Sequence, residues 1–194
     1  ASSIISTELS LILYAFKGWF STFRAPSKDL LSFTVYKELN YSTIFGVFIF
    51  LLINETIICH VVIAIFSKKG AYILTGLSIY CLLWFIGDYQ AIRLQPVLLS
   101  HANLYLRSGI RWKCKISVNN ISKIEKAAEF KKDKSLLNIS ILGKPELIIH
   151  LHYPVEVSGL FGVMKRVQKI GVSIDDPQRF KYEIKKRSHL GQHN

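Results

Sequence analysis

Asn54, Glu55 and His60 are the residues whose types and spacing point most directly to chemistry. They lie inside the apolar stretch Tyr41–Phe66. An ionised carboxylate in the middle of a bilayer costs at least about 2.5 kcal/mol, so it pairs, becomes protonated or faces a cavity. A carboxyl group and an imidazole therefore predict a polar site for a proton, an ion or a partner helix. The alternative is a protonated Glu55 that hydrogen-bonds to a neighbouring helix and contributes only to packing.

Two apolar stretches would position these residues. Tyr41–Phe66 is followed, after the link 67–70, by the second stretch, 71–86. Crossing a hydrocarbon core of about 30 Å takes about 20 helical residues, and backbone groups in lipid must be satisfied within the segment. We therefore expect an antiparallel hairpin of two membrane-spanning helices.

The link sets which residues of the two helices face each other. Folding the hairpin about the middle of the link places Glu55 level with Leu82, and His60 level with Leu77. Polar side chains of the second stretch are then within a turn of this level. The predicted intramembrane polar site comprises Asn54, Glu55, His60, Ser78 and Tyr80.

Other residues are predicted at the membrane interface. Residues 6–23 have apolar residues three and four apart, which predicts a helix that carries Trp19 and is either interfacial or the end of a span that began upstream. Asp88 and Arg93 follow the second stretch and are expected, exposed, at the level of the lipid headgroups. More Lys and Arg residues flank the spans than lie in the link, which predicts a multi-pass protein of the inner (cytoplasmic) membrane with both termini in the cytoplasm.

Positive charge is concentrated after the spans. The chain of 194 residues has a net charge of +12, and most of it lies from Asp88 onward. Arg111, Lys113 and Lys115 alternate with apolar residues, which predicts a half-buried strand with a basic face. This face would lie against anionic lipid or simply face water.

The sequence after Gln95 predicts a small all-β domain. Alternation and turn residues indicate seven strands, and Asp175-Asp176-Pro177 begins a C-terminal helix. This is the element count of a barrel-like, pleckstrin-homology-like (PH-like) domain. Specific phosphoinositide binding is not expected, because the first hairpin loop lacks Lys and Arg. The predicted strands are 95–100, 103–107, 111–117, 121–126, 136–142, 146–152 and 167–174, and the predicted divisions of the chain are 1–40, 41–93, 94–188 and 189–194.

Metal and cofactor sites are not predicted. His150 and His152 could share a metal ion, but His101 is only a distant third ligand and structural zinc takes four. Motifs for catalysis, nucleotide binding or nucleic-acid binding are missing. Three cysteines, Cys59, Cys81 and Cys114, do not make a disulfide framework.

Four segments together resemble a group of bacterial membrane proteins that have a transmembrane hairpin followed by a small β-rich domain. They are NETIICH at 54–60, LTGLSIYCLLWFIGDYQAIRLQPVLLS at 74–100, LYLRSGIRWKCKI at 104–116 and IGVSIDDPQRF at 170–180. The similarity runs from about residue 33 to residue 180. It implies an architecture, and it implies no catalytic residues.

The sequence thus predicts a membrane protein that acts as an adaptor or accessory subunit of a membrane assembly, with a protein partner and the bilayer as its contacts. The alternative is a membrane enzyme or a proton- or ion-linked component that uses Glu55 and His60. Because the second span leads into the first strand without a flexible linker, the β-domain should be held close to the membrane. The charged loop 127–135 and the end of the C-terminal helix are the expected mobile parts.

Overall fold

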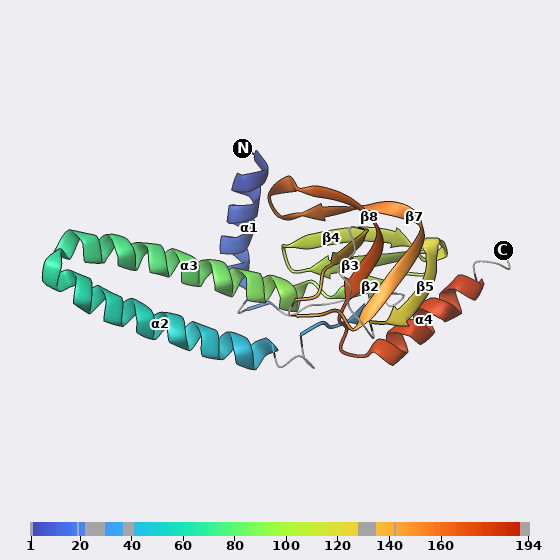
Figure 1. Ribbon diagram of the computed structural model, residues 1–194, viewed down its shortest axis with the longest axis horizontal. Helices are drawn as coiled ribbons and strands as arrows, with labels where there is room; N and C mark the ends of the chain where they lie inside the picture. The colour runs from blue at the N-terminus through green and yellow to red at the C-terminus, as the bar shows by residue number, and fades with distance from the viewer. Residues whose placement is uncertain are drawn as a thin grey trace.

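The computed structural model of the chain describes residues 2–18, 20–21, 30–36, 41–127, 135–141 and 143–190. Figure 1 shows a long helical hairpin that projects from a β-sheet, with a further helix at each end of the chain. The N-terminal helix α1 (Ser2–Lys17) crosses the hairpin close to the sheet. It begins and ends earlier than predicted from the sequence.

The hairpin consists of α2 (Tyr41–Phe66) and α3 (Lys68–Leu94), which run antiparallel. Ser67 alone separates them. Its backbone is extended, and its hydroxyl accepts a hydrogen bond from the N–H of Gly70 at 3.1 Å, which caps α3. The cap draws three of the four predicted link residues into α3, so the helix starts earlier than the apolar pattern indicated.

Both hairpin helices are long and apolar enough to cross a membrane. Their most apolar windows have mean hydropathies of 2.3 and 1.6, and 0% and 11% of those windows are buried. Large apolar side chains such as Phe50, Ile57 and Ile73 are exposed on them. The core helix of a soluble protein would instead be mostly buried, so this exposed apolar surface is compatible with a membrane around the hairpin.

The β-sheet has eight strands in the described ranges. Its order is β1-β2-β3-β4-β7-β8-β6, and β5 also pairs with β7. All described pairings are antiparallel except that of β6 with β8. The strands are β1 (Leu31–Phe33), β2 (Val97–Leu99), β3 (Asn103–Ser108), β4 (Trp112–Ser117), β5 (Ile121–Lys126), β6 (Leu136–Asn138), β7 (Leu147–Gly159) and β8 (Met164–Val172).

Seven of these strands lie in the predicted order. β5 has the predicted bounds, and one or both ends of the other six are shifted. β7 continues through Pro154, which the sequence indicated as a turn. Proline is tolerated there because the ladder with β8 shifts register between His150 and Val155. β1 was not predicted, since its three residues lie in a segment that reads as a polar connector.

The C-terminal helix α4 (Pro177–Leu190) begins where the sequence predicted it. The side chain of Asp176 accepts a hydrogen bond from the N–H of Arg179 at 3.0 Å, which caps the helix. Phe180 and Ile184 are buried in the core of the sheet, and the ring of Phe180 meets that of Phe33 edge-on at 5.2 Å. The PH-like identity of the domain stays a prediction.

The hairpin and the sheet share one hydrophobic core. Tyr41 at the start of α2 and Ile92 near the end of α3 are buried in the same cluster as Leu104, Ile149 and the other core residues of the sheet. α3 ends at Leu94 and β2 begins at Val97. The sheet is therefore packed directly against the base of the hairpin and does not hang from a linker.

Candidate functional site

The predicted polar residues of the hairpin occupy three separate places. His60 contacts Thr75 across the hairpin, with 2.7 Å between His60 Nδ1 and Thr75 Oγ1. The hydroxyl of Thr75 donates its hydrogen to the carbonyl of Ala71 at 2.9 Å. With the hydroxyl hydrogen directed at Ala71, the matching tautomer of His60 donates through Nδ1–H to Thr75 Oγ1.

Glu55 lies in an open groove between α2 and α3. The groove has a volume of about 190 Å³ and holds Ser78 opposite Glu55. Glu55 is exposed and has no hydrogen bond or ion pair with any residue of the described ranges. The full lining is Leu52, Glu55, Thr56, Cys59, Leu74, Leu77, Ser78 and Cys81.

Two polar side chains next to Glu55 are satisfied by backbone carbonyls of α2. Asn54 donates to the carbonyl of Phe50, and Thr56 donates to that of Leu52, both at 2.8 Å. Asn54 and Thr56 are thus paired within α2, whereas the carboxylate of Glu55 has no hydrogen-bond partner among the described residues. The spacing along α2 places Cys59 on the same face as Glu55, but the sequence did not indicate Thr75 as the partner of His60 or Cys81 near Glu55, since these two positions depend on the register of the hairpin.

Tyr80 belongs to a contact with α1. Its hydroxyl donates to Glu8 Oε2 at 2.7 Å. Tyr80 is thus turned away from the groove that contains Ser78 and Glu55, and the structure does not gather the five predicted residues into one site. The side chain of Glu8 gave no signal in the sequence, because the crossing of α1 over the hairpin is a long-range contact.

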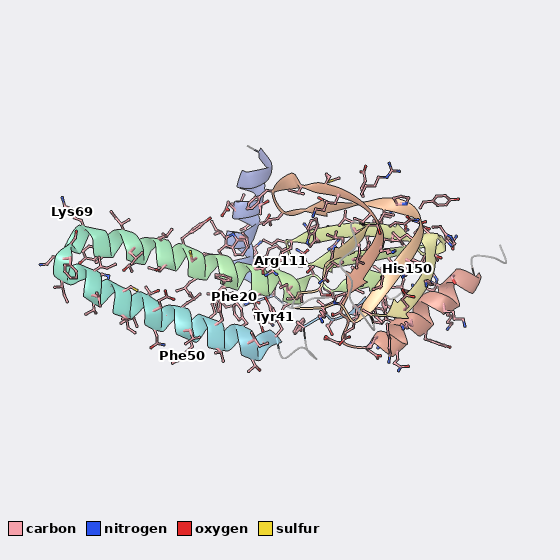
Figure 2. The ribbon with its side chains drawn as sticks, in the orientation of Figure 1. Phe20, Tyr41, Phe50, Lys69, Arg111 and His150 are labelled. Atoms are coloured by element: carbon pink, nitrogen blue, oxygen red, sulfur yellow. The ribbon has the colours of Figure 1, made fainter. Side chains whose placement is uncertain are left out.

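Asp88 is buried and not exposed at an interface, which corrects the expectation from the sequence. Its side chain is 2% exposed, and Oδ2 lies 2.5 Å from Nη2 of Arg111 in the turn between β3 and β4. Figure 2 shows Arg111 where α3 meets the sheet. Oδ1 of Asp88 is buried and has no hydrogen-bond partner in the described residues.

Glycines allow the chain to enclose Asp88. A Cβ atom on Gly87 would overlap the backbone oxygen of Leu11, so the absence of a side chain lets α1 lie directly on α3. Gly109 has a φ of +54°, which favours glycine, and a Cβ there would lie 2.8 Å from Ile92 Cγ1 and 3.3 Å from Asp88 Oδ1. The close approach of α1 at Gly87 and that of the turn at Gly109 thus both depend on glycine, next to the buried carboxylate of Asp88.

The remaining predicted interface and basic residues are dispersed. Arg93 donates to Gln90 Oε1 at 3.0 Å and lies 5.9 Å from the ring of Tyr89, and it is half-buried. Trp19 and most of the loop 127–135 lie outside the described residues. Arg111 is bound to Asp88, so Lys113 and Lys115 are the members of the predicted basic face that remain exposed.

His150 takes part in an ion cluster across two strands. Its Nε2 is 2.6 Å from Glu125 Oε1, and Lys123 Nζ is 2.7 Å from Glu125 Oε2. The neighbouring Lys123, and then His150, lower the pKa of Glu125. His152 is exposed, and no group of three His, Cys, Asp or Glu residues in the described part of the chain could hold a metal ion.

Cys114 is buried in the sheet. Burial raises the pKa of its thiol to about 11, so the group stays protonated near neutral pH and is a poor nucleophile. The thiol behaves as a small apolar side chain that packs against the core.

Comparison of the chain with protein-family models, with curated proteins and with solved structures found no match. The resemblance to bacterial membrane proteins therefore stays a prediction. What the geometry defines is a groove on an apolar hairpin, with a carboxylate that has no described partner, and a buried ion pair that fixes the hairpin to a sheet.

Proposed function

We propose that this chain is a membrane-anchored adaptor or accessory subunit, and that the groove between α2 and α3 receives a transmembrane helix of a partner protein. The observation that carries the proposal is Glu55. Its carboxyl group faces an open groove on a hairpin whose surroundings are apolar, and it has no partner in the described residues.

The exposure of α2 and α3 supports placing the hairpin in a bilayer. We propose that the protein is multi-pass, lies in the inner membrane and keeps its PH-like β-domain and both termini in the cytoplasm. The distribution of Lys and Arg supports this orientation: Arg24, Lys28 and Lys37 precede α2, whereas the tip carries only Lys68 and Lys69.

A partner helix would offset the free-energy cost of placing the carboxyl group of Glu55 in lipid. An ionised carboxylate at this depth costs a few kcal/mol, and even a protonated one should hydrogen-bond. A helix with a hydroxyl, amide or basic side chain at this level would satisfy Glu55 and cover the apolar lining of the groove. The groove is open and has a volume of about 190 Å³, which suits a polar side chain of such a helix.

The competing function, a proton- or ion-linked membrane component, requires Glu55 and His60 to work together. The two residues have different surroundings: His60 is paired with Thr75, whereas Glu55 faces the groove with Ser78. This separation favours the adaptor over the proton-linked alternative.

Site-specific photo-crosslinking tests the proposal. A photoreactive residue at Ser78, in the groove, should capture a membrane protein in intact membranes, and Glu55→Leu should weaken that capture at least fivefold. A photoreactive residue at Ile57, which is exposed on α2 but does not line the groove, is the matched control. Equal capture from both positions, a product that contains only this chain, or purification as an uncomplexed monomer would each contradict the proposal.

A further inference from the structure

A second groove, on the opposite end of the molecule from the hairpin tip, runs between β5 and α4 (Figure 1). Its volume is about 360 Å³. Neither the hairpin nor the buried ion pair contributes to it. It is lined by Ile121, Ser122, Lys123, Ile124, Lys181, Ile184, Lys185 and Ser188.

β5 exposes one of its edges to this groove. Within the described ranges β5 pairs only with β7, so its second edge has no strand partner. Successive side chains of a strand point to opposite faces, yet four consecutive residues of β5 line the groove, at a register shift in the ladder with β7 between Ile121 and Lys123. The groove thus takes in both faces of β5 beside its free edge, where unpaired N–H and C=O groups can accept another strand.

The lining combines an apolar floor with a basic rim. Ile121, Ile124 and Ile184 are buried or half-buried, and lysines come from both walls: Lys123 from β5, and Lys181 and Lys185 from α4. Lys123 Nζ lies 2.7 Å from Glu125 Oε2, so its charge is partly neutralised. Lys181 and Lys185 of α4 should therefore attract an anion more strongly. The apolar floor suits apolar side chains of a ligand, and the basic rim suits its carboxylates.

We propose that the β5–α4 groove binds an extended segment of a partner protein in which acidic and apolar residues alternate, added as a strand to the free edge of β5. Alternation is required because a strand presents successive side chains to opposite faces, here the isoleucine floor and the lysine rim. β5 has six residues, so a segment of about six residues, roughly 20 Å long, matches its length. The inference goes beyond the proposed function, because it needs no contact in the membrane.

Charge favours a partner segment over the adjoining parts of this chain. Residues 128–134 contain three lysines against one Glu and one Asp, and residues 191–194 contain no acidic residue. The apolar floor and the strand edge favour a peptide over a lipid headgroup, since a headgroup uses neither.

Binding of a labelled peptide to the full chain in nanodiscs of neutral phosphatidylcholine tests the proposal. The probe is Glu-Val-Glu-Val-Glu-Val, measured by fluorescence anisotropy. Controls are the block sequence Glu-Glu-Glu-Val-Val-Val, which keeps composition and charge, and an N-methylated form of the probe, which removes backbone donors. The alternating peptide should bind at least tenfold more tightly than either control.

Variants of α4 locate the site. Lys181→Glu with Lys185→Glu should weaken binding about tenfold, because two attractions become repulsions. Lys186→Glu is the matched control, since Lys186 is exposed on the same helix but does not line the groove. It should change the affinity less than twofold.

Several results would overturn the inference. Equal affinity for the block or N-methylated peptide would show simple charge attraction. Protection of Lys181 and Lys185 from acetylation by phosphatidylglycerol nanodiscs, but not by the peptide, would show a lipid surface. Because no partner helix is present in this assay, failure here leaves the crosslinking result at Ser78 unaffected, and failure of that experiment leaves this one standing.

Discussion

Asp88 Oδ2 lies 2.5 Å from Nη2 of Arg111, and this contact joins the helix that carries the hairpin to the turn between two strands of the sheet. The two partners are unequally buried: the side chain of Asp88 is 2% exposed and that of Arg111 is 37% exposed. Arg111 can therefore be hydrated when its partner is lost, whereas Asp88 cannot. Removal of one partner of a buried pair costs more than the pair itself contributes.

The unequal burial predicts an unequal response to mutation. Arg111→Gln leaves the buried carboxylate of Asp88 without its ion-pair partner and should destabilise the protein by about 3 kcal/mol. Asp88→Asn leaves a partly hydrated arginine and should cost about 1 kcal/mol. Chemical unfolding in detergent, followed by tryptophan fluorescence, measures both. A larger loss for Asp88→Asn would show that Arg111 is the poorly hydrated partner.

Gly87 and Gly76 form a matched pair of glycines on α3. Gly87→Ala should displace α1, because the added Cβ would overlap the backbone of Leu11. Gly76→Ala meets nothing within 4 Å and should raise helix stability by up to about 1 kcal/mol.

Limited proteolysis of α1 separates the two glycine variants. Faster cleavage is expected for Gly87→Ala alone, together with loss of the hydrogen bond from Tyr80 to Glu8. Unchanged cleavage of Gly87→Ala would mean that α1 does not need the close approach.

Phe180 anchors α4 in the core of the sheet. It is fully buried and contacts Phe33, so Phe180→Ala should cost about 3–5 kcal/mol. Tyr182→Ala, two residues along on the exposed side of the same helix, should change the free energy of unfolding by less than about 0.5 kcal/mol. Thermal unfolding of the two variants is the measurement, and similar losses would contradict the placement of α4.

Glu125 makes stability depend on pH. Its folded-state pKa is lowered from 4.5 by Lys123 and His150. A lowered pKa contributes stability that is present above about pH 4.5 and is lost as the pH falls through the folded-state value. Glu125→Gln should flatten the stability profile in that acidic window. An unchanged profile for Glu125→Gln would contradict this prediction.

The sequence predicted the two long helices, the order of seven strands and α4, because length, apolar pattern and capping residues determine these locally. It placed Glu55 and His60 less accurately. Because Ser67 caps α3, the helix starts three residues earlier than predicted. The turn of the hairpin is therefore centred on Ser67 and not on the middle of the predicted link 67–70. His60 therefore meets Thr75 and not the level of Leu77.

Long-range contacts account for the rest of the difference. Asp88 follows an apolar stretch, which favours an interfacial position, whereas in the structure it lies under the turn at Gly109 and against Arg111. β1 is three residues long and depends on pairing with β2. None of these contacts leaves a periodic pattern in the sequence.

The parallel pairing of β6 with β8 sets the order of events during synthesis. Leu136 of β6 pairs with Lys169, and Asn138 pairs with Gly171, so β6 has no neighbour until about 30 further residues have been made. At about 5–20 residues per second, the ribosome has released the whole hairpin several seconds before this neighbour emerges. The hairpin can thus fold, and make the membrane insertion proposed above, while the sheet is still open, and a chain that terminates before β8 would leave β6 without its described partner.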